Sequence, residues 1–398
     1  MTESGLLTGR YADALLGVFG TPALVIDRGE GCWVWDVDGR RYLDLLGGIA
    51  VNALGHNHPE LVAAVSKQAG AAVHVSNFFT TRPQIELAET LLRLADAPAG
   101  SRVFLANSGT EAMEAAIKLA RRTGRTGILA AEGAFHGRTT GALALTHKAA
   151  YREPFAPLLP GVEHIPYDDL DALAARLGPD IGAVVLEPIQ GEAGVRVPGE
   201  DYLRGARELT RAAGALLIVD EIQTGIGRTG DWFAYQRAGI VPDAITLAKG
   251  LGGGVPVGAL VTLGERASGL LEPGMHGSTF GGNPLAAAAG LAVLNTIEHD
   301  DLLGAVVRVG AHLSDRIGAL RHPQIAHLRG RGLLLAIGLA GPIAPAAAAV
   351  ARDAGFIVNP VAADAIRLAP PLILTTDEAD LFVDALPGIL DAAAEATR

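Results

Sequence analysis

The chain has 398 residues, of which 49% are hydrophobic and 19% are charged, so a disordered protein is excluded and two domains in one body are expected. The formal net charge of -11 argues against a broad nucleic-acid-binding face, although it leaves room for a local anion pocket. Cys32 is the only cysteine, so an internal disulfide is excluded.

Targeting signals and membrane segments are not evident in the sequence. It has no uninterrupted apolar run long enough to span a bilayer. The N-terminal segment carries Glu3 and lacks the basic stretch and apolar core of a signal peptide. A single cysteine also fits a reducing compartment. We therefore expect a cytoplasmic protein with no membrane or nucleic-acid partner.

The elements are expected in the following order. Apolar and polar residues alternate from Trp33 to Asp44, and Asp38-Gly39 supplies a turn, which predicts a β-hairpin. From about residue 60 the pattern changes to helices that alternate with short apolar strands. We expect helices over 83–97, 110–122 and 202–213, and strands over 102–106, 127–131, 182–187, 216–220 and 244–247. This alternation predicts an α/β fold with a mostly parallel sheet covered by helices on both faces.

The C-terminal third has a different pattern. A long Ala-rich helix is expected after Asn283-Pro284, followed by a smaller α+β region with strands over 333–337 and 366–368. The early hairpin and this tail are expected to form one discontinuous domain. The predicted organisation is a large domain over 61–284 and a small domain made of 1–60 and 285–398.

Lys249 is the most informative residue, because an apolar strand delivers it into a run of glycines. The neighbouring strand pattern, 216–220, ends in Asp220. This pair suits a site for pyridoxal phosphate (PLP), in which the lysine binds the cofactor covalently and the aspartate keeps the pyridine nitrogen protonated. Alone, Lys249 would be more typical of a surface lysine before a flexible loop.

Two loops rich in glycine and hydroxyl groups are candidates for binding a phosphate. The first joins a strand to a helix and presents Ser108, Gly109 and Thr110 to an anion, although an ordinary N-cap would use the same residues. The second precedes the Ala-rich helix and holds Ser278 and Thr279; a plain loop is its alternative. Neither matches a nucleoside-triphosphate loop or a dinucleotide fingerprint, which weakens the ATPase and dehydrogenase interpretations.

Four further residues are candidates for contacts with the ring and the substrate. Phe135 could stack on a flat cofactor, and Arg138 could bind a carboxylate through two parallel hydrogen bonds. Glu192 could neutralise an arginine, and Arg367, flanked by apolar residues, needs an anionic partner. Their ordinary alternatives are core packing for the phenylalanine, a surface ion pair or a structural partner for the arginines, and a solvated loop carboxylate for the glutamate.

The sequence gives no support for a metal site or for a serine hydrolase. His56 and His58 flank Asn57 while His136 stands apart, and no third ligand has helical spacing to them, so we expect no metal. The Gly-x-Ser-x-Gly elbow of serine hydrolases is absent.

Taken together, these segments resemble the class-III (ornithine/acetylornithine-type) PLP-dependent aminotransferases of fold type I. The resemblance extends in order along nearly the whole chain. The segments that carry it are Leu45–Asn52, Asn107–Ala112, Phe135–Thr139, Leu186–Glu192, Asp220–Gly230, Lys249, Gly277–Pro284 and the stretch around Arg367. The resemblance implies a PLP enzyme that acts as a homodimer with shared active sites.

The resemblance also implies how the cofactor is held. Lys249 matches the lysine that binds PLP and moves the proton, and Asp220 matches the partner of the pyridine nitrogen. Gln223 matches the residue near the ring hydroxyl, while Phe135 and Ile222 match the residues on the two ring faces. The phosphate is expected to contact Ser108, Gly109, Thr110 and, from the neighbouring subunit, Thr279.

For the substrates, the resemblance implies two arginine clamps. Arg138 matches the clamp for the donor's α-carboxylate or for the distal carboxylate of glutamate. Arg367 matches the arginine that receives the α-carboxylate of glutamate or 2-oxoglutarate, and Glu192 matches the acid that pairs with it in the other half-reaction. Ser278 and Ile49 complete the expected substrate site.

Ile49 bears on the choice of donor. Ornithine-specific relatives carry a tyrosine at the matching position, where it contacts the free α-amino group, whereas an apolar residue suits an acyl-blocked amine. The expected reaction is therefore between N2-acetylornithine and 2-oxoglutarate, giving N-acetylglutamate 5-semialdehyde and glutamate, in arginine biosynthesis. Succinylornithine, succinyl-diaminopimelate, ornithine and 4-aminobutyrate remain alternative donors.

Two other functions compete with this one. A PLP-dependent aminomutase would share the fold but need no external 2-oxo acid. A non-catalytic protein of the same fold would be favoured by loss of Lys249 or Asp220, and both are present.

Overall fold

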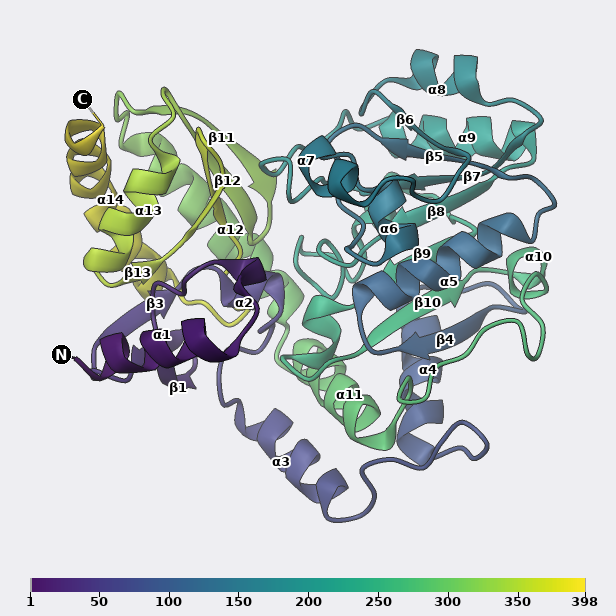
Figure 1. The fold of residues 1–398 in the computed structure, drawn as a ribbon, viewed down its shortest axis with the longest axis horizontal. Helices are drawn as coiled ribbons and strands as arrows, with labels where there is room; N and C mark the ends of the chain where they lie inside the picture. The colour runs from purple at the N-terminus through teal and green to yellow at the C-terminus, as the bar shows by residue number, and fades with distance from the viewer. Residues whose placement is uncertain (1, 398) are drawn as a thin grey trace.

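The computed structural model describes residues 2–397, in which helices surround three β-sheets (Figure 1). The largest sheet has seven strands in the order β4-β10-β9-β8-β7-β5-β6. These strands are β4 (Arg102–Ala106), β5 (Gly127–Ala131), β6 (Val162–Ile165), β7 (Ile181–Leu186), β8 (Leu216–Asp220), β9 (Ala244–Leu247) and β10 (Gly258–Thr262). Strands β5 to β9 pair in parallel, whereas β10 is antiparallel to both β9 and β4. The expected α/β fold with a mostly parallel sheet is confirmed.

Helices cover both faces of this sheet, because alternate residues of a strand point to opposite sides. Ile128 and Ala130 of β5 pack in one hydrophobic cluster with α5 (Gly109–Arg121). Leu129 and Ala131 belong to a second cluster, which includes residues of α9 (Tyr202–Ala213). Both sides of the strands are therefore apolar, as expected for a buried parallel sheet.

The strands expected at 102–106, 127–131, 216–220 and 244–247 are confirmed at these bounds, and the one expected at 182–187 lies one residue earlier. Two strands of the large sheet were not predicted. Strand β6 lies at the edge and is short, with the polar residues Glu163 and His164 at its centre. Strand β10 follows β9 with only the glycine-rich segment and a short 3-10 helix (Lys249–Gly252) between them.

The two smaller sheets lie in a second body, which also holds both chain termini (Figure 1). One sheet contains β1 (Ile26–Glu30), β2 (Trp33–Asp36), β3 (Arg41–Asp44) and β13 (Phe356–Ile357), and the other contains β11 (Ile325–Arg331), β12 (Leu334–Leu339), β15 (Ala365–Leu368) and β14 (Asn359–Ala362). The predicted hairpin is the β2–β3 pair, whose turn includes Gly39 at φ 86°. Strand β13 pairs in parallel with β3, so distant segments of the chain share one sheet. The domain boundaries near residues 60 and 284 remain a prediction.

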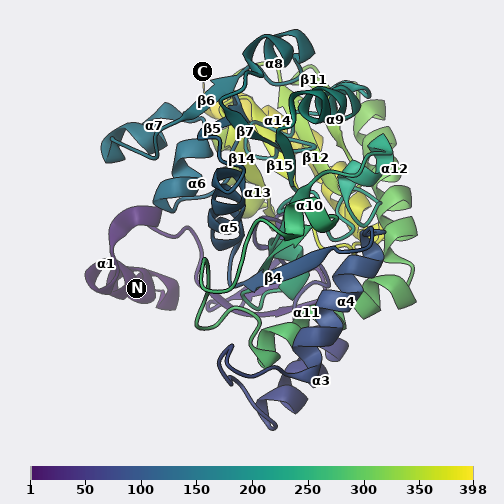
Figure 2. The same ribbon diagram turned by 90° about the vertical axis from the view of Figure 1, so that its right-hand side faces the viewer.

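The long helix α11 (Pro284–His299) begins where the sequence indicated. The Asn283 side chain accepts a hydrogen bond from the Ala286 N–H at 2.9 Å, and Pro284 occupies the first turn. Helix α11 packs against α3 (Pro59–Ala69) and α4 (Arg82–Leu94), below the large sheet in Figure 2. The remaining helices are α1 (Glu3–Ala14), α2 (Gly47–Ala50), α6 (Thr140–Leu145), α7 (Ala149–Arg152), α8 (Leu170–Arg176), α10 (Glu265–Ser268), α12 (Leu302–Ala319), α13 (Ala344–Asp353) and α14 (Thr376–Ala396). Within residues 2–397, none of the helices has the length and hydrophobicity required to cross a bilayer.

A buried acid at the end of β8 makes folding stability depend on pH. The Glu221 side chain accepts hydrogen bonds from the Thr224 hydroxyl at 2.5 Å and the Tyr235 N–H at 2.8 Å. Burial raises the pKa of Glu221 from 4.5 to about 7. Since the folded-state pKa is the higher one, this stability is present below pH 4.5 and is lost as the pH rises through 7.

We therefore expect Glu221→Gln to flatten the pH dependence of stability. Between pH 4.5 and pH 8 the wild type should lose about 3 kcal/mol more unfolding free energy than the variant. Urea unfolding at a fixed protein and PLP concentration measures the difference. Parallel stability curves for the two proteins would contradict the assigned pKa shift.

Candidate functional site

The candidate site is a cavity of about 430 Å³ at the carboxyl edge of the large sheet. Four strands deliver residues to it directly: β4 leads to Asn107, β7 to Glu187, β8 ends in Asp220, and β9 leads to Lys249. The carboxyl ends of parallel strands meet at one edge, where open α/β sheets bind their ligands. Of the predicted site residues, those that line the cavity are Ser108, Gly109, Thr110, Phe135, Arg138, Glu192, Asp220, Ile222, Gln223 and Lys249.

Lys249 is the second residue after the end of β9 and has a left-handed backbone, with φ of 44°. This conformation is uncommon for a residue with a side chain and is found where the surrounding structure imposes it. Burial lowers the pKa of Lys249, against the opposing effect of the nearby Glu192 carboxylate. A lowered pKa makes the neutral, nucleophilic amine easier to form.

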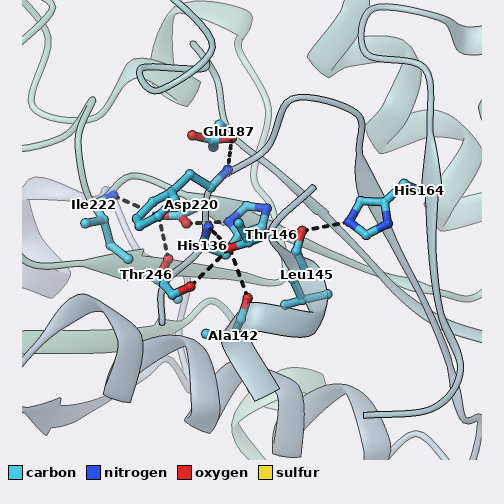
Figure 3. Close-up of polar contacts among 11 residues, drawn as sticks. His136, Ala142, Leu145, Thr146, His164, Glu187, Asp220, Ile222 and Thr246 are labelled. Atoms are coloured by element: carbon cyan, nitrogen blue, oxygen red, sulfur yellow. Dashed lines mark hydrogen bonds and ion pairs between the residues drawn. The ribbon is translucent and has the colours of Figure 1, made fainter. Parts of the chain in front are cut away.

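Asp220 is held by three hydrogen bonds that leave its carboxylate in one orientation (Figure 3). One oxygen accepts from the Thr246 hydroxyl at 3.1 Å and from the Ile222 N–H at 3.0 Å, and the other contacts His136 Nδ1 at 2.6 Å. An ionised carboxylate only accepts hydrogen bonds, so the imidazole carries a proton on Nδ1. The Asp220 side chain is thus buried and held in one orientation at the cavity.

His136 is a site residue that sequence reasoning missed, because it was considered only as a metal ligand. Its ring is buried, and its backbone N–H donates to the Thr146 hydroxyl at 3.0 Å (Figure 3). Among residues 2–397, no group of three or more potential metal ligands includes it. Sequence alone offered no signal for the pairing, since His136 and Asp220 are 84 positions apart.

Glu187 was also missed as a site residue. Its carboxyl group accepts a hydrogen bond from the Phe135 N–H at 3.2 Å, which ties the strand end of β7 to the segment that carries the predicted ring-stacking residue. Burial, with a smaller contribution from Asp220, raises the pKa of Glu187 well above its ordinary value. The neutral form is therefore favoured, and the cavity gains no second strong anion beside Asp220.

The predicted phosphate-binding residues surround the first turn of α5. Ser108 is its N-cap and accepts a hydrogen bond from the Glu111 N–H at 3.3 Å. A Cβ atom at Gly109 would lie only 2.8 Å from Ile222 Cδ1, so a side chain at this position would displace Ile222 from its place at the cavity. The Thr110 hydroxyl contacts the Thr139 hydroxyl at 2.7 Å. A helix N-terminus with hydroxyls and no side chain in the way suits an anion.

Glu192 and Gln223 line another wall of the cavity, and both are hydrogen-bonded to the buried Arg367. Arg367, on β15, is 1% exposed, and its Nη1 lies 2.5 Å from the Glu192 carboxylate and 3.1 Å from Gln223 Oε1. Burial raises the pKa of Glu192, but Arg367 and Lys249 outweigh this effect and the net pKa is lowered. Within the described chain the buried Arg367 Nε has no hydrogen-bond partner, so the guanidinium keeps one free donor.

Arg138 lies at the exposed rim of the cavity. Its guanidinium carbon is 3.4 Å from the centre of the Tyr151 ring and 5.7 Å from that of Phe135. Across residues 2–397, Arg138 forms no ion pair with a carboxylate. Its positive charge is thus available to a ligand at the mouth of the cavity.

Four predicted site residues do not line this cavity in the single chain: Arg367, which is hydrogen-bonded to the lining residues Glu192 and Gln223, and Ile49, Ser278 and Thr279. The Ser278 hydroxyl accepts a hydrogen bond from Asn107 Nδ2 at 3.1 Å, and Thr279 borders a separate small recess. Ile49 is 44% exposed and has φ of 66°, a left-handed conformation that is rare for a β-branched residue. Such strain persists only where the surrounding structure enforces it, and it occurs often at ligand sites.

The residues present fit PLP. Lys249 in the cavity has a lowered pKa, which suits the bond to the cofactor. The buried carboxylate of Asp220 suits the pyridine nitrogen, and the N-terminus of α5 at Gly109 suits the phosphate. Phe135 and Ile222 both line the cavity and are apolar, as required by the two faces of a flat ring.

Comparisons with known proteins agree with this geometry. The chain matches the family model for class-III aminotransferases over residues 19–390. It is 54% identical over 392 residues to the acetylornithine aminotransferase of Mycobacterium tuberculosis H37Rv, covering 98% of each chain. It is 53% identical over 390 residues to the Streptomyces coelicolor acetylornithine aminotransferase, covering 98% of this chain and 96% of that one.

The solved structures are similar over almost the same extent. The crystal structure of the ornithine aminotransferase from Toxoplasma gondii ME49 matches with a TM-score of 0.94 and 32% identity, covering 100% of this chain and 97% of that one. A PLP-bound amine transaminase from an uncultivated Pseudomonas species matches with a TM-score of 0.86 and 33% identity, covering 96% and 97%.

Proposed function

The chain belongs to the class-III aminotransferases, and from this premise we propose that it transfers the terminal amino group of N2-acetyl-L-ornithine to 2-oxoglutarate. The products are N-acetyl-L-glutamate 5-semialdehyde and L-glutamate, and the reversible reaction belongs to arginine biosynthesis. The observation that carries the choice of substrate is the identity of 50–54% to several acetylornithine aminotransferases along nearly the whole chain. The enzyme is a PLP-dependent transaminase.

Each cofactor-binding residue has one task in this proposal. When bound, PLP supplies the electron sink that stabilises negative charge at the reacting substrate carbon. Lys249 Nζ holds the cofactor and moves a proton to and from that carbon. Asp220, oriented by its hydrogen bond with His136, holds a proton on the pyridine nitrogen. The remaining residues orient the cofactor: Gln223 at the ring hydroxyl, Phe135 and Ile222 on the ring faces, and Ser108, Gly109 and Thr110 at the phosphate.

The Glu192–Arg367 pair lets one cavity accept two unlike substrates. Glutamate reacts through its α-amine, so its α-carboxylate must bind close to the reacting carbon, where Arg367, whose Nε has no hydrogen-bond partner among residues 2–397, is proposed to supply the charged partner. N2-acetylornithine reacts through its terminal amine and brings no carboxylate to this position. Glu192 then pairs with Arg367, with 2.5 Å between its carboxylate oxygen and Nη1, so Arg367 is not left as an unpaired buried charge.

Arg138 binds the other end of the donor. The α-carboxylate of N2-acetylornithine lies far from its terminal amine, and the unpaired guanidinium at the cavity rim provides the matching charge. Ile49 offers no polar contact to a free ammonium group, which favours an acylated α-amine over ornithine. Ser278 is proposed to complete the substrate site.

A homodimer is part of the proposal. Thr279 lies outside the cavity of its own chain, in agreement with a role at the partner's phosphate. Next to it, Asn77 Nδ2 donates to the Ser278 carbonyl at 3.0 Å, so the segments around residues 78 and 280 adjoin. Phe78 is 95% exposed and Phe280 is 60% exposed, and such an apolar patch suits a protein interface. We place the enzyme in the cytoplasm, as its biosynthetic role requires.

Donor preference tests the proposed function. We expect N2-acetylornithine to convert bound PLP to pyridoxamine phosphate at least about tenfold faster than ornithine, a difference of roughly 1.4 kcal/mol in activation free energy. Stopped-flow absorbance of the PLP-loaded enzyme measures this half-reaction. Adding 2-oxoglutarate should restore the PLP spectrum, which an aminomutase would not require.

The same measurement with other donors separates the alternatives. Succinylornithine, succinyl-diaminopimelate and 4-aminobutyrate are compared at equal concentration. A faster reaction with ornithine or 4-aminobutyrate would contradict the proposed donor and the interpretation of Ile49, whereas the transaminase assignment would stand.

A further inference from the structure

Tyr151 lies beside the substrate clamp but had no place in the sequence-based site. It belongs to the short helix α7, between α6 and β6, and it is partly buried. Helix α7 is fixed at its end by a hydrogen bond of 3.1 Å from Arg152 Nε to the His147 carbonyl. Tyr151 therefore has a defined position relative to the cavity rim.

The Tyr151 ring contacts two residues of the site at once. Its face carries the Arg138 guanidinium, with 3.4 Å between the guanidinium carbon and the ring centre. Its plane is nearly perpendicular to that of Phe135, at 84°, with 6.5 Å between ring centres. Tyr151 thus connects the substrate clamp with the residue proposed to stack on the cofactor.

The contact has a consequence for how Arg138 binds an anion. A guanidinium stacked on an aromatic ring keeps its N–H groups in its own plane, free to point at a carboxylate. Within the described residues no carboxylate pairs with Arg138, so the ring is the contact that orients it. An arginine on an exposed rim otherwise samples many rotamers, and fixing one costs entropy when the substrate binds.

A second cation shares the same ring. Lys148 Nζ lies 4.7 Å from the Tyr151 ring centre and 3.5 Å from its hydroxyl oxygen. Two positive charges at the rim attract an anionic substrate group, and they repel each other. The stacking on Tyr151 therefore also keeps Arg138 at a fixed position near Lys148.

We propose that Tyr151 is a positioning residue for the amino donor: its ring orients Arg138 for two parallel hydrogen bonds to the donor carboxylate. The inference rests on the proposed function, which supplies the carboxylate-bearing donor. Tyr151 does not touch the reacting atoms. Its contribution is confined to binding of the carboxylate.

Two substitutions separate the ring from the hydroxyl. Tyr151→Phe keeps the ring, whereas Tyr151→Leu removes it. The donor is N2-acetylornithine, and its matched control is N-acetyl-1,4-diaminobutane, the same molecule without the carboxylate. For Tyr151→Leu we expect the KM for N2-acetylornithine to rise about two- to fivefold with little change in kcat, as for loss of an exposed cation–π contact. Tyr151→Phe should stay close to the wild type, and kinetics with the control amine should not change.

The double variant with Arg138→Ala provides an internal control. Once the guanidinium is absent, Tyr151→Leu should raise the KM no further. PLP content and melting temperature are measured for every variant, and Tyr151→Met replaces the leucine variant if the latter is unstable. An unchanged donor KM, an equal loss with the carboxylate-free amine, or additive losses in the double variant would overturn the inference.

Failure of the proposed function is recognised separately, in the wild type. If the wild-type enzyme prefers another carboxylate-bearing donor, the same variants are tested with that donor and its carboxylate-free analogue. The ratio of variant to wild-type KM then decides the role of Tyr151 in either case.

Discussion

The Lys249→Ala variant is expected to lose at least about a thousandfold in kcat, or roughly 4 kcal/mol in activation free energy, while it still folds and binds PLP. Lys249 is the only lysine that lines the cavity; the other three lysines of the chain, Lys67, Lys118 and Lys148, are exposed. No other amine of a lysine can therefore take over its task. Binding of PLP persists, because the α5 N-terminus and Asp220 are unchanged.

Three measurements check this result. Steady-state assays with N2-acetylornithine and 2-oxoglutarate give kcat, and PLP content after gel filtration reports cofactor binding. Borohydride treatment followed by mass spectrometry should attach PLP covalently to the wild type only. Lys67→Ala, on the surface of α3, is the matched control and should behave like the wild type. Normal turnover of Lys249→Ala would refute the assigned site.

Asp220→Asn is expected to lower kcat at least about a hundredfold, or roughly 2.7 kcal/mol. The substitution preserves the shape of the side chain and an oxygen that can accept from Ile222 and Thr246, but it removes the buried negative charge. The pyridine nitrogen then loses the anion that keeps it protonated, and the cofactor becomes a weaker electron sink.

A matched control exists in the same hydrogen-bond group. Thr246→Val removes only the neutral hydroxyl that donates to Asp220 at 3.1 Å, so we expect its effect on kcat to be below about tenfold. Stopped-flow half-reactions with both variants give the rates, and PLP content shows whether binding is preserved. A loss below about tenfold for Asp220→Asn would contradict its role at the pyridine nitrogen.

Much of the fold was accessible from local patterns. The strands at 102–106, 127–131, 216–220 and 244–247 appear at their predicted bounds, because runs of buried apolar residues between turns have a strong local signal. Helix α11 begins at the predicted Asn-Pro pair for the same reason, since capping involves only neighbouring residues. Strand β10 escaped prediction because its antiparallel pairing with β4 and β9 depends on partners far away in the chain.

Some residues of the candidate site could likewise be predicted from local patterns, and others could not. Lys249 and Asp220 could be singled out because each follows or ends an apolar strand, and the ends of parallel strands meet at one edge. The partnership of Glu192 with Arg367 came from family resemblance, and the structure adds that the buried Nε of Arg367 has no hydrogen-bond partner within residues 2–397. Ser278, Thr279, Ile49 and Arg367 do not line the cavity in one chain, and their roles, like those of the lining residues, stay predictions.

Local sequence patterns were enough to predict the class of fold, the strand ends that carry Lys249 and Asp220, and the chemistry that these two residues suit. These properties depend on hydrophobic periodicity and on the residue types at turns, which are encoded over a few neighbouring positions. Three features emerged only from the folded structure: His136 orients Asp220, burial raises the pKa of Glu187, and Tyr151 stacks on Arg138. The reason is physical: such contacts join segments that pack from different elements, and burial, which sets their charge states, exists only once the chain has folded.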